Sequence, residues 1–157
     1  MSSSSSDQET YRRLAVELRI LEGTAETLQS RLNLVNAYLT ELNVAKLTLE
    51  GVEKENPDAS LFVPIGGGSF IKAKLECIDK VIVGAGAGVS IERTMTEAKQ
   101  TVQNRIGELE KTRTSLQQQF VQVVDRINED RERLQGLSER LSQVGRRANV
   151  SETARRP

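Results

Sequence analysis

The sequence predicts an α+β protein in which a long antiparallel coiled-coil hairpin of two helices is joined by two β-hairpins. Three observations predict this fold. Both flanks carry a seven-residue apolar repeat, the middle switches to a period of two, and Gly and β-branched residues cluster there. With 157 residues, the chain is expected to form a single domain over residues 1–157.

The first helix is expected over residues 10–52, because a coiled-coil seam runs through that stretch. No Pro interrupts the repeat, and Gly51 followed by Asn56-Pro57 marks its end. The Ser-rich residues 1–9 lack the charged region and apolar core of a signal peptide, so we expect a disordered tail. Eleven of the twelve a and d positions of the helix are apolar: Tyr11, Leu14, Leu18, Leu21, Ala25, Leu28, Leu32, Val35, Leu39, Leu42, Lys46 and Leu49.

The second helix is expected over residues 94–145. Its first residues, Thr94-Met95-Thr96-Glu97, have the form of a capping box. Residues 146–157 indicate a flexible basic tail. Ten of the twelve seam positions are apolar: Ile106, Leu109, Arg113, Leu116, Phe120, Val123, Ile127, Asp130, Leu134, Leu137, Leu141 and Val144.

Two of these seam residues, Arg113 and Asp130, are charged, and two explanations are open. Either the side chains are partly exposed, with their polar ends in water, or they set the register of the coiled coil at a cost in stability. An antiparallel register that places Leu49 near Met95 brings Leu18 close to Arg126. The second helix then outruns the first from residue 131 onwards.

The middle of the chain, residues 60–93, predicts two consecutive β-hairpins. The turns are Gly66-Gly67-Gly68-Ser69 and residues 84–88, each between short apolar strands. Strands this apolar need cover on both faces, and the chain has no further globular segment to supply it. We therefore expect the hairpins to assemble with other chains through Val63, Ile65, Phe70, Ile71, Leu75, Val81, Val83, Val89 and Ile91.

Composition excludes several functions. Lys and Arg together number 22, as do Asp and Glu, and this zero net charge argues against a nucleic-acid binder. No apolar run approaches the roughly 20 residues of a membrane span. The single Cys77, expected to pack on the second strand, suits the reducing cytoplasm. The chain has no His, and its Gly-rich turns lack the spacing and following helix of a phosphate loop. We expect no catalytic residues, no cofactor and no metal.

The hairpin residues also carry a resemblance to a known family. Leu61-Phe-Val-Pro-Ile-Gly-Gly-Gly-Ser-Phe-Ile-Lys72, Val81-Ile-Val-Gly84 and Gly86-Ala-Gly-Val-Ser-Ile-Glu-Arg93 resemble the α-class subunit of prefoldin, of the archaeal type to which eukaryotic α-class subunits are related. The flanking helices match by length and pattern, and both tails are unmatched. One departure is Val89, where relatives often carry Tyr.

This resemblance implies a function. It implies that the hairpins form an oligomeric β-barrel, in a hexamer of two α and four β-class subunits. Such a hexamer holds non-native client proteins without ATP and delivers them to a group II chaperonin. The client-binding tip would comprise Tyr11, Leu14, Leu18, Leu134, Leu137, Leu141 and Val144. The alternative is a coiled-coil scaffold or tether that oligomerises through its hairpins. Protection of a denatured client distinguishes the two.

Overall fold

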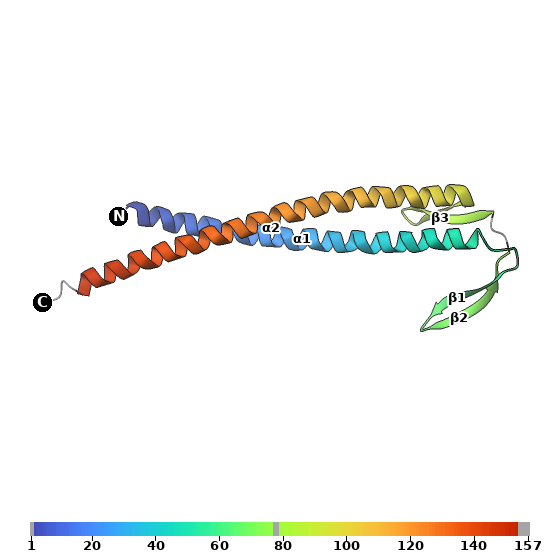
Figure 1. Ribbon diagram of the computed structural model, residues 1–157, viewed down its shortest axis with the longest axis horizontal. Coiled ribbons are helices and arrows are strands. Elements are labelled where there is room, and N and C mark those ends of the chain that lie inside the picture. The colour runs from blue at the N-terminus through green and yellow to red at the C-terminus, as the bar shows by residue number, and fades with distance from the viewer. Residues whose placement is uncertain (1, 77–78, 154–157) are drawn as a thin grey trace. The chain divides into compact units, whose positions relative to one another are not determined.

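The computed structural model of the protein describes residues 2–76 and 79–153. Its elements follow the order α1 (Ser2–Val52), β1 (Ser60–Gly66), β2 (Ser69–Lys74), β3 (Lys80–Gly86), β4 (Val89–Thr94) and α2 (Met95–Thr153) (Figure 1). The predicted α+β class, with two long helices joined by two β-hairpins, is confirmed. Two compact units are distinguished: a terminal unit (residues 1–33 and 114–157) and a hairpin unit (residues 34–113).

Both helices extend further than the sequence predicted. The helix α1 begins at Ser2 instead of residue 10, and α2 continues to Thr153 beyond the expected end at residue 145. Residues 2–9 contain neither Gly nor Pro, and each costs at most about 0.7 kcal/mol in a helix relative to Ala. A helix continued from the seam can absorb these costs, so the proposed tails are largely helical. Residues 1 and 154–157 lie outside the described part of the chain.

The helix α2 begins with a reciprocal capping box, as predicted. The backbone N–H of Thr94 donates to Glu97 Oε2 at 3.0 Å, and the backbone N–H of Glu97 donates to Thr94 Oγ1 at 3.3 Å. The Thr94 hydroxyl also donates to Glu97 Oε2, at 3.0 Å. The backbone hydrogen bond, then the hydroxyl, then the charge of Arg93 lower the pKa of the Glu97 carboxyl.

The two hairpins repeat the same geometry. Strand β1 pairs with β2 and β3 with β4, each antiparallel and each with a register shift beside the turn. The central turn residues have positive φ in both: 57° and 73° at Gly67 and Gly68, and 50° and 76° at Ala87 and Gly88. Positive φ at both positions defines a type I′ turn, whose twist matches that of the strands. Ala87 is thus an L-residue held in a conformation that favours glycine.

The hairpin unit has its core between the two helices. Leu39 of α1 and Val102 and Ile106 of α2 form a buried cluster. An ion pair also lies in this unit, between Lys99 Nζ of α2 and Glu53 Oε2, which are 2.7 Å apart. The partly buried residues packed against the cluster are Val35, Leu42, Leu49 and Leu109, all of them predicted seam positions.

The terminal unit is held by seam residues and by ion pairs between the helices. Arg126 Nη2 lies 3.2 Å from Glu17 Oε1, next to the predicted contact of Leu18 with Arg126. Arg131 Nη2 lies 2.6 Å from Glu22 Oε1. Arg131 still contacts α1, so the expectation that α2 outruns α1 from residue 131 onwards is wrong. Among the described residues of this unit, the buried apolar side chains are Leu28, Leu32, Ile127 and Leu137.

Candidate functional site

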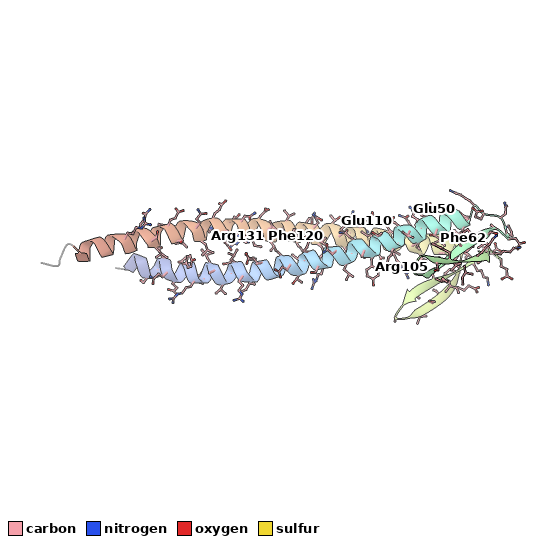
Figure 2. The ribbon with its side chains drawn as sticks, turned by 90° about the horizontal axis from the view of Figure 1, so that it is seen from below. Glu50, Phe62, Arg105, Glu110, Phe120 and Arg131 are labelled. Carbon is pink, nitrogen blue, oxygen red and sulfur yellow. The ribbon has the colours of Figure 1, made fainter. Side chains whose placement is uncertain are left out.

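The β1–β2 hairpin exposes apolar side chains on both of its faces. Directly paired residues share a face, so Val63 and Ile71 lie on one side. Phe62 and Phe70 lie on the other side and are 70% and 60% exposed. Figure 2 labels Phe62 on this hairpin. Among the described residues, both faces keep these large apolar side chains exposed, so this hairpin is a candidate binding surface.

The β3–β4 hairpin differs because one of its faces is partly covered. Val81 is partly buried and Val83 is buried, whereas Ile82 on the opposite face is exposed. Arg105 of α2, labelled in Figure 2, donates a hydrogen bond to the backbone carbonyl of Gly84. This bond holds β3 against α2. The covered face of β3 therefore has less free surface to offer a partner than either face of the first hairpin.

The residues predicted for assembly fall into these two environments. Six are exposed within the chain: Val63, Ile65, Phe70, Ile71, Val89 and Ile91. Leu75 and Val81 are partly buried, and Val83 is buried. The prediction did not include Phe62 or Ile82, although both are among the most exposed apolar residues. The available signal was their position in an apolar strand, directly beside Val63 for Phe62 and between Val81 and Val83 for Ile82. Cys77 lies outside the described residues.

The seven residues predicted for client binding all belong to the terminal unit. Tyr11 and Val144 are 38% and 49% exposed. Leu14, Leu18, Leu134 and Leu141 are partly buried, and Leu137 is buried at 6% exposure. Tyr11 and Val144 are therefore the members of this set that offer the most apolar surface to another molecule.

Asp130 is the most deeply buried charge in the terminal unit. Its side chain is 0% exposed, and neither carboxylate oxygen accepts a hydrogen bond from the described residues. Oδ1 lies 3.6 Å from Arg126 Nε and 3.8 Å from Arg133 Nη1. Partial exposure, which describes Arg113, is therefore wrong for Asp130. Its role in setting the register remains a prediction.

The described part of the chain shows neither a metal site nor a membrane span. Over residues 2–76 and 79–153, no three His, Cys, Asp or Glu side chains are grouped to hold a metal ion. Within the same ranges, no helix is long and apolar enough to cross a bilayer.

Comparison with known proteins agrees with this architecture. Residues 21–140 match the family described as Prefoldin subunit. The prefoldin subunit alpha of Methanopyrus kandleri is 35% identical over 113 residues, covering 72% of each chain. That of Methanobrevibacter smithii is 30% identical over 147 residues, covering 93% of this chain and 96% of the relative. A chain in the cryo-EM structure of filamentous PFD from Methanocaldococcus jannaschii shares the fold, with a TM-score of 0.62 and 24% identity over 71% of this chain and 92% of that one.

Proposed function

This chain belongs to the prefoldin family, in its α class, and we propose that it is a subunit of an ATP-independent holdase that passes non-native proteins to a group II chaperonin. Prefoldins are chaperones and not enzymes, so a chaperone-type function follows from membership. The observation that carries the finer proposal is the match to α subunits across both helices and both hairpins. We place the complex in the cytoplasm.

We infer that the hairpins join this chain to β-class subunits, two α with four β, around an oligomeric β-barrel. The exposed apolar side chains on both faces of the β1–β2 hairpin support this inference. A two-stranded sheet is marginal in water, and closing a barrel with other chains would bury apolar side chains on one of these faces.

We infer further that clients are held at the terminal unit. Burying an exposed apolar side chain contributes about 25 cal/mol for each Å² removed from water. Tyr11 and Val144 offer such area, and the partly buried seam leucines offer less. Each contact is weak, but several subunits around one client raise the effective concentration of the next contact. Because each contact is weak, the client can pass to a chaperonin without nucleotide hydrolysis.

The test compares client protection by hexamers that carry matched substitutions. The chain is co-expressed with candidate β-class subunits, and the mass of the complex is measured by native mass spectrometry. Tyr11→Ser with Val144→Ser should leave the hexamer intact but slow the aggregation of a denatured client less, as followed by light scattering. The control is Val16→Ser with Val121→Ser, two residues of the terminal unit that are exposed off the seam. Its protection should equal that of the unmodified hexamer.

Two results would contradict the proposal. Equal protection by both variants, across clients of different size, would show that these residues are not the client site. An unmodified hexamer that protects no client would leave the scaffold or tether function, with the hairpins as its means of assembly.

A further inference from the structure

A groove runs between α1 and α2 in the hairpin unit, and the proposed function does not use it. Its volume is about 580 Å³, within the range of small-ligand sites. Its lining residues are Tyr38, Glu41, Leu42, Ala45, Arg105, Glu108, Leu109 and Thr112.

The floor of this groove is apolar. Leu42 and Leu109 are partly buried, and Tyr38 on one side is exposed. Leu34 lies one helical turn before Tyr38 and is also exposed, so an apolar stripe continues from the groove along α1. An exposed tyrosine and leucine on one helix face, beside an apolar groove, indicate a surface that another apolar surface covers.

The rim of the groove is acidic. Glu41 and Glu108 are exposed, and the described part of the structure records no ion pair or hydrogen bond for either carboxylate. The one basic residue of the lining, Arg105, is engaged with the Gly84 carbonyl. An apolar surface that carries unpaired cations would therefore fit this groove best.

We propose that the groove accepts the β1–β2 hairpin of a second copy of this chain. One face of that hairpin carries Phe62 and Phe70, diagonal neighbours across the two strands. Lys72 pairs directly with Phe62, and Lys74 follows on the same face about 7 Å further along β2. Like the two glutamates, both lysines are exposed without a recorded partner in the described residues. The phenyl rings would lie on the groove floor, and the lysines would reach the acidic rim.

This inference rests on the proposed assembly role and assigns a partner to one face of the hairpin. A barrel formed by several chains would cover one face of each strand pair, and we assign to it the face of Val63 and Ile71, which lie directly opposite each other. The face with Phe62 and Phe70 would stay in water unless something else covers it. Two copies that exchange hairpins bury both such faces in one contact with twofold symmetry.

Charge reversal tests the contact with the full-length chain. The acidic variant carries Lys72→Glu and Lys74→Glu, so that its hairpin and its groove are both negative. The basic variant carries Glu41→Lys and Glu108→Lys, so that both are positive. Each variant alone should self-associate at least about tenfold more weakly than the unmodified chain in sedimentation equilibrium, because like charges then meet at the contact. An equal mixture should associate as the unmodified chain does, because both contacts of a mixed pair are complementary.

Matched controls change the same number of charges elsewhere. Lys54→Glu with Lys111→Glu, and Glu9→Lys with Glu26→Lys, alter exposed residues outside the groove and the hairpin. Each control should self-associate as the unmodified chain does, and mixing the two should change nothing.

Several outcomes would overturn the proposal. One is that the unmodified chain stays monomeric. Another is that the unmodified chain self-associates and each variant alone self-associates just as strongly. A third outcome is that the mixture still self-associates weakly, while one chain carrying all four substitutions self-associates as the unmodified chain does. That result would show that the hairpin binds the groove of its own chain. A basic variant that loses only client protection would assign the groove to clients.

The failure of this inference is distinguishable from that of the proposed function. If the acidic and basic variants self-associate as the unmodified chain does and also enter a hexamer with β-class subunits, the groove contact is refuted and the proposed chaperone function is not. If mixing the two variants restores self-association, but the unmodified chain forms no complex with β-class subunits, the groove contact is supported and the proposed hexamer is refuted.

Discussion

The Asp130 carboxylate lies 3.6 Å from the Arg126 guanidinium on the same helix, although Asp130 is fully buried and Arg126 is exposed. The same guanidinium lies 3.2 Å from the carboxylate of Glu17 on α1. Arg126 thus connects a buried charge on one helix to a partly buried charge on the other. Since any slip of one helix past the other would break the Arg126–Glu17 pair, we expect these residues to favour a single register within the terminal unit.

Replacing the buried carboxylate of Asp130 with an apolar side chain should stabilise the protein but allow more than one helix register. We expect Asp130→Leu to raise the free energy of unfolding by about 1 kcal/mol or more, because apolar substitutes for buried ion pairs are often stabilising by about 1–4 kcal/mol. Cysteines introduced at Thr24 and Gln122, which line one groove of the terminal unit, should cross-link in the unmodified background with Cys77→Ser. In Asp130→Leu, a second pair one turn away, Thr24 with Gln119, should cross-link as well. Asp130→Asn serves as the isosteric control. A single cross-linked register in Asp130→Leu would show that the aspartate is merely tolerated.

The capping box of α2 should make stability depend on pH through Glu97. Folding lowers the pKa of this carboxyl, so its contribution is complete above the ordinary glutamate pKa of about 4.3. The contribution is lost as the pH falls through the lowered value. We expect Glu97→Gln, which keeps the capping geometry without the charge, to melt below the unmodified chain at neutral pH. The two melting temperatures should converge in strong acid. Glu132→Gln, on an exposed part of α2, should show no such convergence, and a gap for Glu97→Gln that is independent of pH would refute this role.

The turn of the second hairpin should be improved by glycine. Ala87 has a φ of 50°, a conformation that costs an L-residue roughly 1–2 kcal/mol. Ala87→Gly should therefore stabilise the hairpin and slow hydrogen exchange of the β3–β4 amides. The greater freedom of glycine in the unfolded chain offsets part of this stabilisation. Ala85→Gly, two residues earlier and outside the set with positive φ, should speed exchange instead. Equal changes in the two variants would show that the turn conformation carries no strain.

Much of the fold could be predicted from the sequence because its signals are local. The seam residues Leu39 and Ile106 follow from a heptad repeat, and the start of α2 follows from Thr94 and Glu97, three residues apart. The glycine turns follow from the need for positive φ at Gly67 and Gly68. Each of these features depends on residues that are close in the sequence, so it can be predicted from a short stretch of sequence.

Burial and pairing were decided by the tertiary structure, because they depend on what a distant segment brings to a side chain. The heptad pattern marks Asp130 as a seam residue, but its complete burial depends on the packing of α1 and α2 in the terminal unit. Val81 and Val83 resemble Val63 in sequence, but the structure holds the second hairpin on α2 through the Arg105 bond to the Gly84 carbonyl. The pairing of Glu17 with Arg126 joins residues more than a hundred positions apart, and a repeat along either helix carries no information about that distance.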